Sequence, residues 1–126
     1  MAMNPRTIAT LIAGGRVVIG AGLLASPPLV TRGWIGDSES AKPGARVMGA
    51  GLGGRDVALG LGVLGALRGG NGAAKPWLLG SAIADLGDLF ATLRSAEELP
   101  KSGVVITGLV AGTAAAAGAW LLTQDL

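Results

Sequence analysis

The chain alternates between four long apolar runs and short connections that contain proline, glycine or charged residues. None of the four runs shows the sustained alternation of polar and apolar positions that marks a half-buried strand, and alanine and glycine are weak strand formers. Prolines stand where a run begins or ends, as expected at helix boundaries. The pattern predicts an all-α fold in which residues 1–126 form one domain, a four-helix transmembrane bundle with antiparallel up-down topology. The expected spans are about 7–28, 45–68, 77–94 and 103–122.

The last run, GVVITGLVAGTAAAAGAWLL, has the length and composition of a membrane span. Twenty uncharged residues at 1.5 Å per residue match the roughly 30 Å hydrocarbon core of a bilayer. The first run is as long but contains Arg16, which disfavours the alternative of a cleaved signal peptide. Trp34, Trp77 and Trp120 fall near the ends of runs, where interfacial tryptophans are found.

The composition also indicates a protein that lies in a lipid bilayer, because 50% of the chain is hydrophobic and only 14% is charged. A protein of this size has a large surface, and here the polar groups are too few to cover it in water. We therefore expect a multi-pass protein of the cell membrane. Its expected partners are the lipid bilayer and either other membrane proteins or a second copy of itself in a homo-oligomer.

The same composition excludes much chemistry. Without cysteine there is no disulfide or thiolate metal site, and without histidine the commonest proton shuttle and metal ligand is missing. A formal net charge of +2 is too small to indicate a nucleic-acid partner. Asp85 and Asp88 stand three residues apart, but no further carboxylate cluster supports a metal site. We expect no cofactor and no metal.

Charged residues inside the apolar runs require partners. An arginine or aspartate at the centre of a membrane helix costs about 2.5 to 3.5 kcal/mol, whereas each leucine, isoleucine or phenylalanine returns about 0.3 to 0.6 kcal/mol. The third run carries two aspartates and cannot balance that cost alone, so its carboxylates must be paired, protonated or hydrated. The charges near mid-run predict an intramembrane network of Arg16, Arg55, Asp56, Asp85 and Asp88.

A polar stripe follows one face of the third expected helix. Its members are Ser81, Asp85, Asp88 and Thr92, at positions i, i+4, i+7 and i+11. This stripe should face the bundle interior, where the planar guanidinium of Arg16 or Arg55 can bind its carboxylates. Asp56 points about 100° away from Arg55 around the helix, so we expect it to contact Arg16 rather than its neighbour.

Small residues recur at every fourth position in two of the runs, a spacing that lets membrane helices approach closely. The expected packing positions are Ala50, Gly54, Ala58, Gly62 and Ala66 in the second run and Gly108, Gly112 and Ala116 in the fourth. The alternative is that a chain rich in alanine and glycine contains such spacings by chance.

Two segments also carry a family resemblance. GRDVALGLGVLGALRG, followed by WLLGSAIADLGDLFATL, resembles small four-helix membrane proteins of unknown function that are abundant in actinobacteria. DoxX-like proteins are similar in size and shape. The matching positions are Gly54, Arg55, Asp56, Gly60, Ala84, Asp85 and Asp88. The resemblance implies a four-helix integral membrane protein, and the redox roles of DoxX-like proteins do not carry over because this chain lacks cysteine.

Three functions fit these observations. The charge network favours a structural role in an accessory or interaction subunit with no catalytic residue. The first alternative is a small transporter or proton-linked carrier that uses the intramembrane aspartates. The second is a membrane enzyme acting on a lipid or isoprenoid, with a protonated aspartate as general acid.

The membrane orientation follows from the charges that flank the expected spans. The basic residues divide into Arg6, Arg68 and Lys75 on the side of the termini and Arg32, Lys42, Arg46, Arg94 and Lys101 on the other. Basic residues accumulate on the cytoplasmic side of membrane proteins. The three-to-five distribution therefore predicts that both termini lie outside the cytoplasm.

Overall fold

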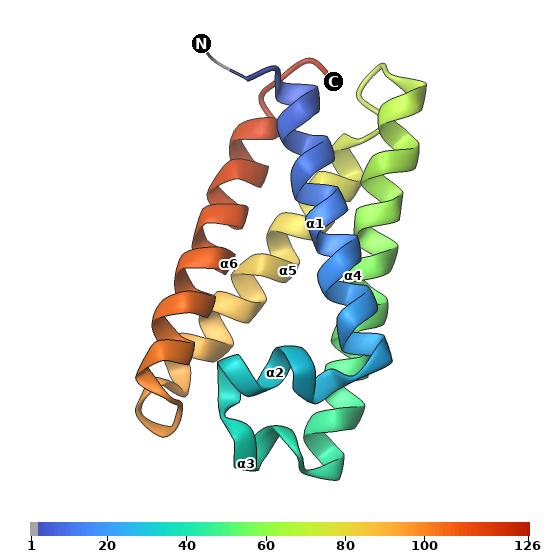
Figure 1. The fold of residues 1–126 in the computed structure, drawn as a ribbon. Helices are drawn as coiled ribbons and strands as arrows, with labels where there is room; N and C mark the ends of the chain where they lie inside the picture. Colours follow the sequence, from blue (N-terminus) through green and yellow to red (C-terminus); the bar gives the residue numbers. More distant parts are fainter. Residues whose placement is uncertain (1–2) are drawn as a thin grey trace.

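The computed structural model describes residues 3–126, and over this range the chain is helical with no strand. The expectation of an all-α fold is therefore confirmed. The long helices are α1 (Pro5–Ala25), α4 (Pro43–Gly69), α5 (Lys75–Arg94) and α6 (Lys101–Leu121), and their ends lie within three residues of the expected spans. Consecutive long helices run in opposite directions, and both termini lie at the same end of the molecule (Figure 1).

Proline sets where these helices begin. All six prolines of the chain lie at or beside the first residue of a helix. The ring fixes φ near its helical value, and the missing N–H is one that a first-turn residue leaves unpaired in any case. At α1 the start is reinforced by Asn4, whose Oδ1 accepts a hydrogen bond of 2.8 Å from the backbone N–H of Arg6.

The connection between α1 and α4 is not the simple link that the sequence predicted. It forms α2 (Pro27–Ile35) and α3 (Asp37–Ser40), which lie across the end of the molecule opposite the termini (Figure 1). Gly36 separates them with a φ of 97°, in the left-handed region that glycine adopts readily. A one-turn 3-10 helix, η1 (Ala96–Glu98), joins α5 to α6.

The long helices associate as two pairs, since α1 packs most extensively against α4, and α5 against α6. The buried positions of the first pair repeat at intervals of four and three residues, the spacing of helices that pack at a small left-handed crossing angle. In α1 they are Ala9, Ala13, Arg16, Gly20 and Leu23, and in α4 they are Gly49, Gly53, Asp56, Gly60, Val63 and Leu67. Charged residues thus occupy core positions of this seam.

Glycine allows α1 and α4 to touch through their backbones. A Cβ atom on Gly20 would lie 2.7 Å from the carbonyl oxygen of Gly53, and a Cβ on Gly53 would lie 2.7 Å from that of Gly20. Further along the pair, a Cβ on Gly60 would lie 2.7 Å from the carbonyl oxygen of Ala13. Any larger residue at these positions would force the two helices apart.

This contact surface differs from the one expected in α4. A Cβ atom on Gly54 would have no neighbouring atom within 4 Å, Ala58 is exposed, and Ala50 is only half-buried. The packed positions lie one residue earlier: Gly53 contacts α1, and Gly49 contacts Pro27 and Thr31 of α2. The α4 sequence contains glycine on several faces, so a four-residue spacing occurs in more than one register and spacing alone does not select the correct one.

The other expected packing positions make different contacts. Gly62 is close-packed, but against the indole ring of Trp77 rather than against a helix backbone. Gly108 and Gly112 lie only at ordinary contact distance, 4.0 Å, from the side chain of Leu89. The tighter approaches of α6 are made by its buried glycines, Gly103 beside the backbone of Trp34 and Gly118 beside Ala82.

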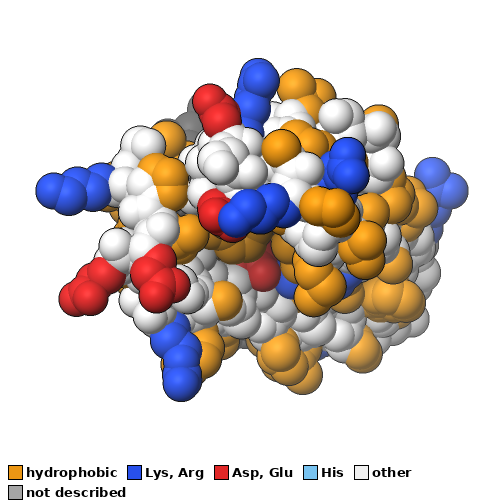
Figure 2. Space-filling view, turned by 90° about the horizontal axis from the view of Figure 1, so that it is seen from below, with side chains coloured by type: hydrophobic (Ala, Val, Ile, Leu, Met, Phe, Trp, Pro, Cys, Tyr) orange, Lys and Arg blue, Asp and Glu red, His pale blue; other side chains and the backbone are white. Residues whose placement is uncertain are grey.

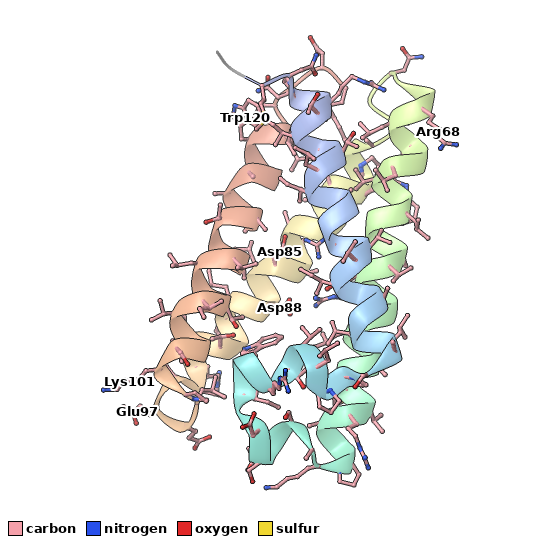
Figure 3. The ribbon with its side chains drawn as sticks, viewed as in Figure 1. Arg68, Asp85, Asp88, Glu97, Lys101 and Trp120 are labelled. Atoms are coloured by element: carbon pink, nitrogen blue, oxygen red, sulfur yellow. The ribbon has the colours of Figure 1, made fainter. Side chains whose placement is uncertain are left out.

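The outer surface of the long helices is apolar. Large exposed side chains follow all four, including Leu11, Val18, Ile19, Leu61, Ile83, Leu86, Phe90, Ile106, Leu109 and Val110. Exposed charges gather instead at the two ends, with Arg68 at one and Glu97 and Lys101 at the other (Figure 3). Viewed from the α2–α3 end, basic and acidic side chains lie on the left, along the top and near the centre of the face, and apolar side chains cover its lower right (Figure 2). Helices α1, α4 and α6 are each long and apolar enough to cross a membrane.

The glycine contact predicts a position-specific effect of alanine. Gly20→Ala should lower the free energy of unfolding by about 1 to 3 kcal/mol, because overpacking a close helix contact forces the backbones apart. Gly54→Ala is the matched control and should cause no loss, since nothing lies near its Cβ. Unfolding in detergent micelles, followed by circular dichroism, measures both variants. Equal losses in the two variants would contradict the assigned contact surface.

Candidate functional site

The five charged residues expected to form a network come together halfway along the long helices. Arg16 lies on α1, Arg55 and Asp56 on α4, and Asp85 and Asp88 on α5. Arg16 stands roughly 16 Å from the start of α1 at 1.5 Å per residue. Figure 3 shows Asp85 near the middle of α5 and Asp88 one turn closer to the α2 end.

Arg16 occupies the inner half of the network. Its Nη1 donates to Oδ1 of Asp56 at 3.1 Å, and its Nη2 donates to Oδ2 of Asp85 at 2.5 Å. The three side chains are only 8 to 11% exposed. Buried charges of this kind are tolerated when opposite charges and hydrogen bonds satisfy them together. One guanidinium thereby joins α1 to both α4 and α5.

Arg55 occupies the outer half. Its two terminal nitrogens bind both oxygens of Asp88, at 3.0 and 2.8 Å, in the bidentate geometry that suits a planar guanidinium. The side chains of Arg55 and Asp88 are 29% and 20% exposed, so this pair lies nearer the surface than the Arg16 contacts. It forms a second link between α4 and α5.

Asp56 contacts both arginines, which corrects the expectation that it would meet Arg16 instead of Arg55. Its Oδ1 accepts from Nη1 of Arg16 and also from Nε and Nη2 of Arg55, at 3.1 and 3.0 Å. The Cβ atoms of residues 55 and 56 diverge, but the long arginine side chain bends back far enough to reach its neighbour. The carboxylate of Asp56 therefore joins the inner and outer halves.

The polar stripe of α5 faces inward as expected. Ser81, Asp85 and Thr92 are buried and Asp88 is half-buried. The hydroxyl of Ser81 donates to the carbonyl oxygen of Trp77 at 2.8 Å, and that of Thr92 donates to the carbonyl oxygen of Asp88 at 2.7 Å. Both hydroxyl protons are thus used within the helix itself, as is usual for serine and threonine inside helices.

Trp34 is a site residue that the sequence analysis missed. Its Nε1 donates to Oγ1 of Thr92 at 3.0 Å, and its backbone packs against Gly103, so it fastens α2 to α5 and α6. The sequence placed Trp34 only as an interfacial residue beyond the first helix. The one signal was the inward-facing spacing of Thr31, Trp34 and Ile35 after a proline pair, but nine residues are too few for a clear periodicity.

A small cavity lies between the four long helices, beside the network. Its volume is about 20 Å³, and its polar lining consists of Arg16, Ser81 and Asp85. Apolar residues such as Val63, Leu78 and Leu121 form the remaining wall. A space of this size holds one water molecule and no organic substrate.

The fully buried polar side-chain atoms of the described residues, 3–126, all have hydrogen-bond partners. The same residues contain no group of three or more carboxylate, histidine or cysteine side chains that could hold a metal ion. Comparisons with protein families, with curated proteins and with solved structures find no match for this chain.

The inner half of the network predicts an unequal response to removing two basic residues. Arg16→Met should lower the free energy of unfolding by about 3 to 5 kcal/mol, because it leaves buried carboxylates without their partner. Lys42→Met is the control, since Lys42 pairs with Glu39 at the exposed end of the molecule and should change stability by less than about 1 kcal/mol. Denaturation in detergent tests both, and a small effect of Arg16→Met would show that the network contributes little to stability.

Proposed function

We propose that the four long helices form an antiparallel transmembrane bundle in the cell membrane. The support is the distribution of side chains: an apolar outer surface between two charged ends, with the remaining charges turned inward at mid-length. Lipid favours this arrangement, because charges at bilayer depth face the interior of a bundle and pair with one another.

Helix α5 is the fourth span in this proposal, although its composition does not mark it as one. Its two aspartates would make insertion unfavourable for an isolated helix. In the folded chain, Asp85 pairs with Arg16 and Asp88 pairs with Arg55, so α5 enters the bundle with its carboxylates matched by α1 and α4. The two aspartates make insertion of α5 alone unfavourable, and the same aspartates favour its binding to α1 and α4.

Within the membrane we propose an accessory or interaction subunit whose charge network is structural. The observation that carries this function is that each charged side chain of the network contacts an opposite charge within it, and the cavity beside it is water-sized. The cavity beside the network is too small for a substrate path or a lipid. A larger hollow of about 540 Å³ is open to the surface at the end of the molecule where the termini lie, lined by Arg6, Lys75 and Asp125 and away from the network. The apolar outer faces are the surfaces open to another membrane protein or a second copy of this chain.

Thiol labelling tests the four spans. The chain has no cysteine, so a single introduced cysteine reports without background. Ala73→Cys, in the exposed turn between α4 and α5, should react with a membrane-impermeant reagent on intact cells. Ser38→Cys, in α3, and Glu97→Cys, in η1 beyond α5, should react only after the membrane is opened, because the excess of basic residues at that end predicts that it lies in the cytoplasm. Reaction of the cysteine at residue 73 from the same side as the one at residue 38 would contradict the crossing of α4, and from the same side as the one at residue 97 would contradict the crossing of α5.

Reconstitution separates the structural role from transport. The wild-type protein in liposomes should show no more proton flux than empty liposomes. The double variant Asp85→Asn/Asp88→Asn should lose stability, because Arg55 then lacks its bidentate partner. Flux is followed with an enclosed pH dye and assembly by detergent unfolding. Wild-type flux that disappears in a normally assembled variant would overturn the structural function in favour of a carrier.

A further inference from the structure

The network contains one more carboxylate than guanidinium. Arg16 and Arg55 supply two positive charges, and Asp56, Asp85 and Asp88 supply three negative ones. Helix α6 contributes no charged side chain to this level of the bundle. An unmatched charge in a low-dielectric interior is strongly unfavourable, and a buried acid relieves it by taking up a proton.

The hydrogen bonds single out which carboxylate is least matched. Asp56 accepts three hydrogen bonds from the two arginines, and Asp88 accepts one on each oxygen from Arg55. Asp85 accepts a single one, from Arg16 to Oδ2, which leaves Oδ1 without a protein donor. Fewer donors to the ionised form mean less stabilisation of its negative charge.

The surroundings of Asp85 suit a protonated acid. No fully buried side-chain oxygen in residues 3–126 lacks a partner, so Oδ1 of Asp85 must border open space, and Asp85 lines the water-sized cavity. Ser81 lines the same cavity one turn away. Its hydroxyl proton is already donated to Trp77, so its oxygen lone pairs remain free to accept.

From these observations we propose that Asp85 is a proton-binding site, neutral at physiological pH. The proton comes from water and forms an O–H bond on Oδ1 of Asp85. That O–H donates to the oxygen of Ser81, directly or through one water molecule in the cavity, while Oδ2 continues to accept from Arg16. Two arginines then face two ionised aspartates, and the network is neutral. This inference rests on the proposed bundle in lipid.

Infrared spectroscopy of the full chain in liposomes tests the proposal. At pH 8, where carboxyl groups in water are ionised, the wild type should show one carbonyl-stretch band of a protonated carboxyl group. The band should shift in Asp85→Glu, disappear in Asp85→Asn and stay in place in the matched control Asp88→Glu. Asp85→Asn should also retain wild-type resistance to unfolding, because asparagine resembles the protonated acid in shape and charge.

Two results would overturn the proposal. One is the absence of a protonated-carboxyl band in the assembled wild type, as expected if a bound cation neutralises the network instead. The other is a band that moves with Asp88→Glu and not with the variants at residue 85. If Asp85→Glu does not assemble, the isosteric Asp85→Asn carries the test. Failure of the four-span bundle would appear in thiol labelling and not as a change confined to this band, so the two failures are distinguishable.

Discussion

The contact on which the structure most depends is the guanidinium of Arg16 between Asp56 and Asp85. It is buried, it lies at mid-length, and it joins three helices through two hydrogen bonds, of 3.1 Å to Asp56 and 2.5 Å to Asp85. Such an interaction requires accurate placement, because a buried charge that loses its partner is far more costly than an exposed one. The positions of α1, α4 and α5 are therefore set by the reach of one side chain, and the apolar contacts around it must fit that distance.

Small residues on either side of Arg16 make this geometry possible. Gly20 follows it by one turn on α1 and meets Gly53, while Ala13 precedes it and meets Gly60. In the proposed membrane bundle there would be little hydrophobic gain between helices, so close packing and interhelical hydrogen bonds would supply the attraction. Small residues thus let the helix backbones approach each other, and the charged residues then form hydrogen bonds between the helices.

The helix boundaries and the network members could be predicted from sequence, whereas their detailed contacts could not. Run length and proline fix α1, α4, α5 and α6, and any charge within an apolar run stands out. The packing register of α4 could not be found, because its glycines lie on several faces and only the partner helix selects Gly53 over Gly54. Helix α2 was not predicted because nine residues are too few to show a clear periodicity. The contact of Arg55 with Asp56 was not predicted because it depends on a bend of the arginine side chain, which the angle between residues around a helix does not describe.

The division of the network into inner and outer halves explains why two arginines are present instead of one. Arg16 on α1 binds Asp85, and Arg55 on α4 binds Asp88, so two different helices hold two positions of α5 that are three residues apart. Sliding α5 by one turn would bring Asp88 toward Arg16 but leave Arg55 without its bidentate partner. With a single arginine–aspartate pair, α5 could shift by one turn if another carboxylate were near the arginine. With two pairs at a fixed spacing, such a shift leaves one arginine without a partner. We infer that the network selects the register between the α1–α4 and α5–α6 pairs, as buried polar residues do in other helical assemblies.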